Sequence, residues 1–397
     1  MEKPIIVLAI GGAGCRFLAQ MREMPEKRNI LPIAIDTDRK SLRETGLPEE
    51  NTLLAAESWR NGRGCGGNIL DGQRAVAHER PAIAALLKSG SMVVIAGGLG
   101  GGTASGGIPV VLSEAAKLHL PTFCILSLPF AMEGSRRTAQ AEKALHENIY
   151  SAADAVAALP NDLLFSSLDE KTPLAEAFQL ADREMSRTVL ALTTILTAGN
   201  LFSASFSDLA QLLQQGHSHC AIGVGVVTDS ESGEDRIDRA VENLLHSPML
   251  GGAERLLQAD AVIFSVLGGP ELSLKEAKTA MELAVKYTPA NGEIFTGAAT
   301  AEAWRGTFQI TALAIKYDAR EKEREILDSA AASTQRKRTK KSSSSDVEQG
   351  LFNFDDNKKG VMEGTIPVLW NGEDLDIPAY KRRDCPITGG KVMRRNQ

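Results

Sequence analysis

The stretch from Met92 to Val111, MVVIAGGLGGGTASGGIPVV, has the residue types of a phosphate-binding loop. An apolar run of strand character passes into seven glycines and then into a helical pattern. Glycine lets backbone N–H groups turn into a shared concavity, and the positive end of the following helix adds to it, so the predicted guest is a triphosphate. The alternative is a structural turn of an ordinary α/β domain. The run GGGTASG lacks the Lys-Ser/Thr ending of a P-loop and the GxGxxG spacing of a dinucleotide fold, which indicates another class of phosphate site.

Two further glycine clusters stand beside predicted strands and helices. The apolar run Pro4 to Ile10 is followed by Gly11, Gly12 and Gly14, and the cluster GRGCGGN at 62–68 precedes a helical pattern over 71–88. Three such loops on one sheet can line a single phosphate site. The segment DTDRKSL (36–42) carries acids where a dinucleotide fold binds ribose, so this segment leaves both classes of nucleotide site open.

The elements that must position these loops follow from hydrophobic periodicity. Pro121 to Leu128 predicts another strand, which ends in PFAMEGSRR. Glu133 and Arg137 are four residues apart, so they would share one side of a helix start, as a surface ion pair or as ligands. Apolar residues from Phe178 to Leu196 recur at helical spacing and predict a long, largely buried helix.

The composition is that of a globular chain of more than one domain. The 397 residues are 43% hydrophobic and 24% charged, with a formal net charge of −6, which argues against broad nucleic-acid binding. The five cysteines have no CxxC pairing, so neither a zinc site nor a disulfide framework is expected, and a reducing cytoplasm fits best. The apolar run 4–10 is too short to span a membrane, so no direct membrane insertion is expected.

The order of these motifs resembles the FtsZ group of bacterial tubulin homologues, in the tubulin/FtsZ GTPase family, over the whole chain. GGLGGGTASGGIPVV resembles the family's signature loop, and IGGAGCRFLAQM and GRGCGGN resemble its first and third glycine loops. The resemblance implies an α/β fold, with a Rossmann-like parallel-sheet GTPase domain, a long central helix and a smaller α+β C-terminal domain. The implied boundaries are 1–175, 176–199 and 200–317, followed by a linker at 318–364 and a partner-binding tail at 365–397.

The same resemblance implies a GTP site, with Mg²⁺ on the phosphates and no metal ligands from the protein. PFAMEGSRR matches the ribose-contacting segment, so Glu133 and Arg137 are expected to face the sugar. LPNDLL and EAFQLAD match the guanine-reading segments, so Asn161 and Asp182 are expected to bond the base and Phe178 to pack against it. The loop residues expected around the nucleotide are Gly11, Gly12, Ala13, Gly14, Cys15, Arg16, Gly64, Gly66, Gly67, Gly100, Gly101, Gly102, Thr103 and Ala104.

The chain departs from the family in the loop that completes the active site of a neighbouring subunit. The matching loop is LFSASFSDLAQLL (201–213), where Asp208 falls on the second acidic position but Ser205 stands on the first, and Ser203 replaces an asparagine. A serine supplies neither charge nor useful basicity at neutral pH, so slow GTP hydrolysis is expected. Arg16 replaces a small amide and is expected either near the phosphates or in solvent. Ala104 replaces a glycine, which an ordinary backbone conformation would tolerate.

The tail resembles the family's C-terminal peptide. DLDIPAYKRR (Asp374 to Arg383) has apolar anchors and a basic flank suited to a groove on membrane tethers and division regulators. The expected function is a cytoplasmic, head-to-tail filament at the division site, because heterologous self-assembly does not close. One alternative is a catalytically silent GTP-binding filament or interaction protein, which Ser205 favours. Another is a nicotinamide-dependent oxidoreductase, which the guanine-reading set and the absence of GxGxxG oppose.

Overall fold

The computed structural model describes residues 3–21, 29–165, 171–197, 217–228, 236–290, 292–317, 369–370 and 373–374. The chain divides into two units, Met1–Ser333 and Thr334–Gln397. In the second unit the described residues form two short strands, β11 (Leu369–Trp370) and β12 (Glu373–Asp374), which pair antiparallel. The predicted linker and most of the predicted tail peptide lie outside the described residues, so those two boundaries stay predictions.

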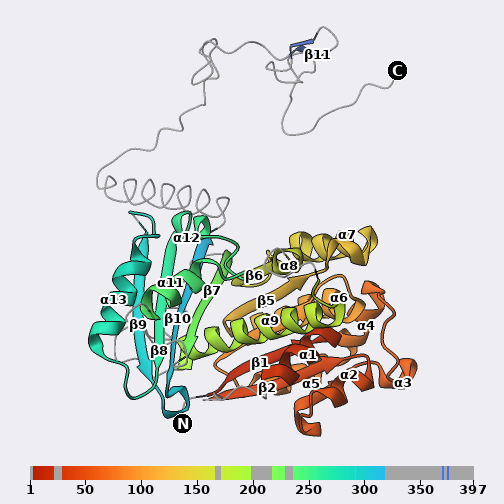
Figure 1. Cartoon of the computed structure of the whole chain (residues 1–397). Helices are drawn as coiled ribbons and strands as arrows, with labels where there is room; N and C mark the ends of the chain where they lie inside the picture. The colour runs from red at the N-terminus through yellow and green to blue at the C-terminus, as the bar shows by residue number, and fades with distance from the viewer. Residues whose placement is uncertain are drawn as a thin grey trace, which may run out of the picture. The chain divides into compact units, whose positions relative to one another are not determined.

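The first unit is built on one ten-stranded sheet with the order β3-β2-β1-β4-β5-β6-β7-β10-β8-β9 (Figure 1). Neighbouring strands are parallel from β3 to β7, while β10 runs antiparallel to both β7 and β8. The strands are β1 (Ile5–Ile10), β2 (Ile30–Asp36), β3 (Thr52–Leu54), β4 (Met92–Gly98), β5 (Thr122–Leu128), β6 (Ala155–Pro160), β7 (Ser218–Thr228), β8 (Ala261–Gly268), β9 (Glu293–Thr300) and β10 (Thr307–Tyr317).

Helices cover both faces of the parallel part of the sheet. The α-helices are α1 (Gly11–Met21), α2 (Arg39–Glu44), α3 (Glu57–Arg60), α4 (Ile69–His78), α5 (Arg80–Leu87), α6 (Gly102–Lys117), α7 (Ser135–Ala144), α8 (Asp162–Phe165), α9 (Leu174–Thr197), α11 (Arg236–Leu245), α12 (Glu254–Leu257) and α13 (Leu274–Val285). A π-helical turn, Leu145–Ile149, continues α7. Among the described residues no helix is both long and apolar enough to cross a membrane.

The predicted helix over 71–88 is wrong in one respect, because the structure divides it into α4 and α5 at Glu79. Pro81 lies in the first turn of α5. Proline has no N–H to give to the preceding turn, and its ring disfavours a helical conformation at the residue before it. A new helix start is the arrangement that tolerates this proline.

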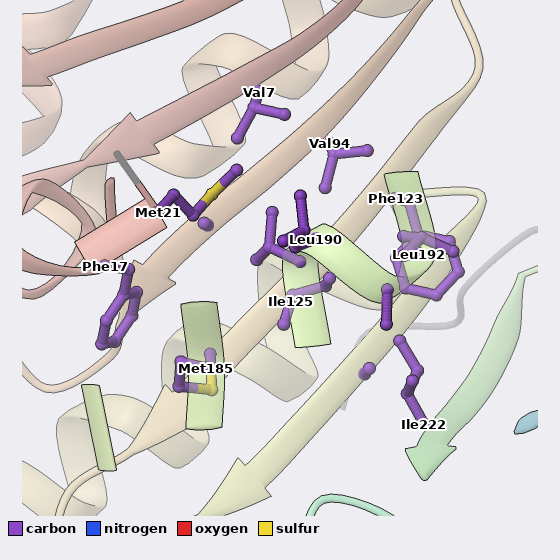
Figure 2. Close-up of a cluster of buried hydrophobic side chains, with 14 of the residues drawn as sticks. Val7, Phe17, Met21, Val94, Phe123, Ile125, Met185, Leu190, Leu192 and Ile222 are labelled. Carbon is purple, nitrogen blue, oxygen red and sulfur yellow. The ribbon is translucent and has the colours of Figure 1, made fainter. Parts of the chain in front are cut away.

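The buried strands have apolar side chains on both faces, as expected of a sheet covered by helices on both sides. Along β1, Val7 faces one hydrophobic cluster and Leu8 the other. In the first cluster α1 and α9 pack on the sheet, and Figure 2 shows side chains of these helices meeting those of the strands, namely Val7, Phe17, Met21, Val94, Phe123, Ile125, Met185, Leu190, Leu192 and Ile222. A third cluster fills the space between β7, β8, β10 and the helices α11 and α13. The core therefore holds α9 directly against the strands.

The crossing of α4 and α6 depends on glycines, because the two backbones touch there. A Cβ atom added to Gly72 would lie 2.0 Å from the carbonyl oxygen of Gly102, and one added to Gly106 would lie 2.2 Å from that of Ile69. Real Cβ atoms do not approach backbone atoms so closely, and backbone cannot move aside as a side chain can. This contact fixes α6, whose N-terminus follows the glycine-rich loop.

We therefore expect Gly106→Ala to destabilise the protein. Alanine in a helix is better than glycine by about 1 kcal/mol, but overpacking a tight contact costs roughly 1–3 kcal/mol or more, so the steric cost should prevail. Urea unfolding of the variant against the wild type measures the difference.

The matched control is Gly12→Ala in α1, where the added Cβ would find its nearest neighbour, the Ser41 hydroxyl, at an ordinary 3.4 Å. The free energy of unfolding of this control should lie within a few tenths of a kcal/mol of that of the wild type, or slightly above it. Equal stability of Gly106→Ala and the wild type would contradict the account of this crossing.

Candidate functional site

A cavity of about 590 Å³ lies where the carboxyl ends of four parallel strands meet. Residues that follow β1, β4, β5 and β6 all contribute to its wall, and α9 closes the opposite side. The strand order reverses between β1 and β4, and open α/β sheets bind their ligands at such a switch point. The lining residues are Gly11, Gly12, Ala13, Arg16, Phe17, Gly98, Leu99, Gly101, Gly102, Thr103, Ala104, Ser127, Pro129, Glu133, Arg137, Asn161, Phe178, Gln179, Ala181, Asp182 and Met185.

Two helix N-termini form one end of this cavity. The helix α1 begins at Gly11, directly after β1, and α6 begins at Gly102, with Gly101 as its N-cap and no side-chain cap. Free N–H groups and the positive end of the helix dipole make such termini sites for anions. A Cβ at Gly101 would meet nothing within 4 Å, so a ligand can approach the backbone there. This end has the chemistry of a polyphosphate site.

Several predicted loop residues serve packing and do not line the cavity. A Cβ on Gly14 would lie 2.6 Å from the Ala96 carbonyl oxygen, and one on Gly100, which has φ of +89°, would lie 2.9 Å from that of Arg137. Cys15 is fully buried, and this burial raises the pKa of its thiol. These three residues therefore let α1 and the signature loop approach their neighbours closely.

The third glycine loop lies beside the start of α6 without lining the cavity. Gly64, Gly66 and Gly67 all have positive φ, at 74°, 57° and 79°, which explains the residue type at each. Cys65 within this loop packs so closely to Gly102 that a Cβ there would lie 2.9 Å away. Ala104 lies inside α6 and is not among the positive-φ residues, so the replacement of a loop glycine causes no strain.

The residues predicted to read a base also line the cavity. Phe178 and Asp182 are one turn apart on α9, and Asn161 follows β6. The rings of Phe178 and Phe130 pack edge to face, with centroids 5.0 Å apart and an interplanar angle of 85°. The backbone N–H of Asn161 donates to the Leu128 carbonyl oxygen at 3.1 Å, which fixes the chain at the end of β6.

Arg16 lines the cavity and forms an ion pair with Asp182, a contact that neither of its two predicted positions included. Its Nε donates to Oδ2 of the carboxylate at 2.7 Å. The Asp182 side chain is only 10% exposed, whereas that of Arg16 is 51% exposed. Burial raises the pKa of Asp182, and the hydrogen bond and charge of Arg16 act in the opposite direction. The proposed base reader is thus a buried carboxylate with an arginine beside it.

Glu133 and Arg137 form the ion pair that the sequence offered as one of two alternatives. The pair joins η2 (Ala131–Glu133) to α7, and both residues also line the cavity, while their role as ligands stays a prediction. The second carboxylate oxygen of Glu133 accepts the N–H of Phe130 at 2.9 Å. The pair is therefore fixed at the cavity wall.

The most informative residue that the sequence did not assign to the site is Asp36, at the end of β2. It is 3% exposed, and one oxygen of its carboxylate accepts the Thr37 N–H at 2.7 Å. The Thr37 hydroxyl in turn lies 2.7 Å from the hydroxyl of Thr103 at the start of α6. Burial raises the pKa of Asp36, and hydrogen bonds from Thr37 and Thr103 partly offset this. Asp36 thus holds a polar network under the α6 N-terminus.

Other lining residues missed by the sequence reasoning are Phe17, Gly98, Leu99, Ser127, Pro129, Gln179, Ala181 and Met185. Their position at strand ends and on the inner faces of α1 and α9 is the signal that would have found them. Ser203, Ser205 and Asp208, predicted at the active site of a neighbouring subunit, lie outside the described residues. Within the described part of the chain, no group of three or more His, Cys, Asp or Glu is arranged to hold a metal ion.

Two family models match the chain. The "Tubulin/FtsZ family, GTPase domain" matches residues 4–169, and the "FtsZ family, C-terminal domain" matches residues 219–318. The first match contains all four of the cavity's strand ends and both helix N-termini, and the second contains the third hydrophobic cluster.

Among curated proteins, Cell division protein FtsZ 1 of Archaeoglobus fulgidus is 31% identical over 298 residues, which cover 75% of this chain and 78% of the relative. Among solved structures, an empty FtsZ dimer from M. jannaschii is 28% identical with a TM-score of 0.71, over 79% of this chain and 88% of that one. CetZ2 from Haloferax volcanii, a GTPgS-bound protofilament, is 20% identical with a TM-score of 0.62, over 83% and 99%, and shows the fold alone.

The buried carboxylate of Asp36 predicts a pH-dependent gain in stability for Asp36→Asn. Because the pKa of Asp36 is raised on folding, the wild type loses stability from this group as the pH rises above the ordinary carboxyl pKa of about 3.9. The asparagine keeps an acceptor for Thr37 and does not titrate. Its advantage in free energy of unfolding should therefore be larger at neutral pH than near the ordinary carboxyl pKa of about 3.9.

Thermal and urea unfolding of both proteins over this pH range measure the effect. Asp38→Asn, at the partly exposed N-cap of α2, removes the same charge two residues away and is the control. An advantage of Asp36→Asn that grows as the pH falls would show that the carboxylate is stabilised by its network when charged.

Proposed function

The chain belongs to the tubulin/FtsZ family, and from this premise we propose that it binds GTP in the cavity, assembles head to tail into filaments and hydrolyses GTP slowly between subunits. The observation that carries the proposal is the composition of the cavity. Two helix N-termini, an aromatic ring and a buried carboxylate all line it. A nucleoside triphosphate has the matching polarity, with anionic phosphates at one end and a flat base at the other.

The three parts of the nucleotide are assigned to three parts of the wall. The phosphates lie against the backbone of Gly11 to Ala13 and of Gly101 to Thr103, and the ribose lies beside Glu133 and Arg137. The base packs on Phe178 and bonds to Asn161 and Asp182. A carboxylate accepts hydrogen bonds from N1–H and the 2-amino group of guanine, whereas adenine presents no such pair of donors, so the site selects guanine.

A magnesium ion fits this arrangement mainly as a partner of the phosphates. Mg²⁺ keeps several waters and is commonly held by substrate phosphates with one or two protein oxygens. The Thr103 hydroxyl, at the start of α6, belongs to a cavity-lining residue and is the protein oxygen that we assign as such a ligand. The ion would offset the negative charge of the phosphates.

Hydrolysis is assigned to the loop at 201–213 of the next subunit in the filament. Asp208 supplies one carboxylate to orient and polarise the attacking water, and Ser205 replaces the second. Loss of a general base typically lowers a rate by about 10²–10⁴-fold, so filaments should form readily and turn over slowly. The dimer named for the related FtsZ structure supports self-association here, and a heterologous contact that does not close would yield a filament.

The cellular role follows from the name of the archaeal relative, a cell division protein. We infer that the filaments form in the cytoplasm at the division site and attach to membrane tethers and regulators through Asp374 to Arg383. This segment combines Ile377, Pro378 and Tyr380 with the basic flank Lys381 to Arg383. A short segment with apolar anchors and a basic flank suits a groove on a partner.

The nucleotide assignment predicts that GTP binds and that ATP and NAD do not compete at equal concentration. Asp182→Asn should weaken GTP binding by roughly tenfold to a hundredfold, because a charged hydrogen-bond acceptor is lost. Titration of a fluorescent GTP analogue below the assembly concentration, with the other nucleotides as competitors, measures both effects.

Glu184→Gln is the matched control for this substitution, since Glu184 lies on the same helix, pairs with Arg187 at 3.1 Å and does not line the cavity. It should bind GTP as the wild type does. Equal displacement by NAD and GTP would instead favour a dinucleotide site.

The hydrolysis assignment predicts that Ser205→Asp accelerates GTP turnover by about tenfold or more, without a comparable change in assembly. Light scattering and phosphate release on the same sample separate the two quantities. Ser207→Asp adds the same charge to the same loop two residues away and should leave the rate near that of the wild type. Brisk turnover by the wild type would show that another group replaces the missing carboxylate, and assembly with no turnover would favour the catalytically silent filament.

A further inference from the structure

The ion pair between Arg16 and Asp182 joins two walls of the cavity at its base end. Arg16 projects from the second turn of α1, and Asp182 lies on α9. Both residues line the cavity, and Nε of the guanidinium and Oδ2 of the carboxylate are 2.7 Å apart. The contact is therefore part of the surface that a base would meet.

Asp182 depends on this contact. Its side chain is 10% exposed, and among the described residues Arg16 is the group that donates a hydrogen bond to its carboxylate. The backbone carbonyl of Asp182 is separately engaged, because it accepts the Ser186 hydroxyl at 2.6 Å. A buried carboxylate that loses its one charged partner tends to take up a proton and is free to rotate.

The contact also leaves room for a ligand. A carboxylate offers about four acceptor positions on two oxygens, and Arg16 occupies one of them, on Oδ2. Oδ1 and the second lone pair of Oδ2 stay available for two further donors. The N1–H and 2-amino groups of guanine are two such donors on adjacent positions of one edge.

We propose that Arg16 is a specificity-determining positioning residue, which holds Asp182 as an oriented carboxylate so that it accepts both N–H donors of guanine. The proposal rests on the proposed function and deepens it, because it states which second residue makes the base site selective. Arg16 acts through Asp182 and is not itself assigned a contact with the base.

Loss of Arg16 should weaken the binding of GTP more than the binding of a nucleotide whose base has one N–H donor fewer. Hypoxanthine, the base of ITP, keeps N1–H but lacks the 2-amino group. A protonated Asp182 carries a hydrogen-bond donor of its own and offers fewer acceptor positions than the carboxylate. The affinity of the site should therefore fall most for guanine, which offers two donors. A change that only loosened the cavity would weaken GTP and ITP equally. The ratio of the two affinities is thus the quantity that separates positioning from a general structural role.

The experiment measures dissociation constants for GTP and ITP below the assembly concentration, for the full-length wild type, Arg16→Gln and Arg16→Lys. We expect Arg16→Gln to bind GTP roughly tenfold to a hundredfold more weakly, with the ratio of ITP to GTP dissociation constants falling toward about one. Lysine restores a charge but not the planar guanidinium, so Arg16→Lys should give an intermediate ratio. If Arg16→Gln does not fold, this intermediate ratio carries the test.

Arg187→Gln is the matched control, because it removes an arginine from an ion pair with Glu184 on α9 that does not line the cavity. It should keep both affinities. Tighter GTP binding by Arg16→Gln would overturn the proposal and show that Arg16 obstructs the site. An unchanged ratio in both Arg16 variants would also overturn it. Failure of the wild type to bind GTP would refute the proposed function itself, whereas normal GTP binding with no effect of Arg16 would refute this inference alone.

Discussion

The site depends on one constraint, the parallel pairing of β1 with β4 in a register that ends both strands together. Ile10, the last residue of β1, pairs with Gly97, one residue before the end of β4. The helices that follow, α1 and α6, therefore begin at the same edge of the sheet and direct two N-termini into one cavity. Backbone N–H groups at each terminus and the positive end of each helix dipole are the features that favour an anion there.

This arrangement requires the backbones of the two loops to lie close together. A Cβ on Gly11 would lie 3.2 Å from the Ala104 nitrogen, so the two loops touch each other as well as the cavity. Beneath them, the network of Asp36, Thr37 and Thr103 ties the end of β2 to the start of α6. A buried carboxylate in this position carries a cost in stability that a purely structural network would avoid. Protein structures accept such local costs more often at functional sites than elsewhere.

The sequence predicted the fold class because buried strands followed by glycines leave a local signal. A run of apolar residues ending in glycines indicates a buried strand and a close backbone approach, and Gly101 and Gly102 line the cavity that follows β4. The same residue type at Gly14 and Gly100 serves packing, and only the positions of Ala96 and Arg137 show the difference. The pairing of Arg16 with Asp182 spans 166 residues, so no local pattern contains it. The helical periodicity over 71–88 continues through the break at Glu79, which Pro81 alone signals.

The proposed base site gains its precision from α9, because this helix packs in the core from Met185 to Ile195. Phe178 and Asp182 stand near its beginning, while Val189 and Leu192 further along are fully buried. Figure 2 shows Leu192 among the side chains of this cluster. The same hydrophobic cluster includes Ile222 of β7, the strand that pairs with β10 and so begins the antiparallel part of the sheet. Residues on a packed helix are positioned more exactly than residues on a loop. A base held by α9 is consequently held by the element that also joins the parallel strands to the C-terminal ones, and any shift between those two parts would change the geometry of the base site.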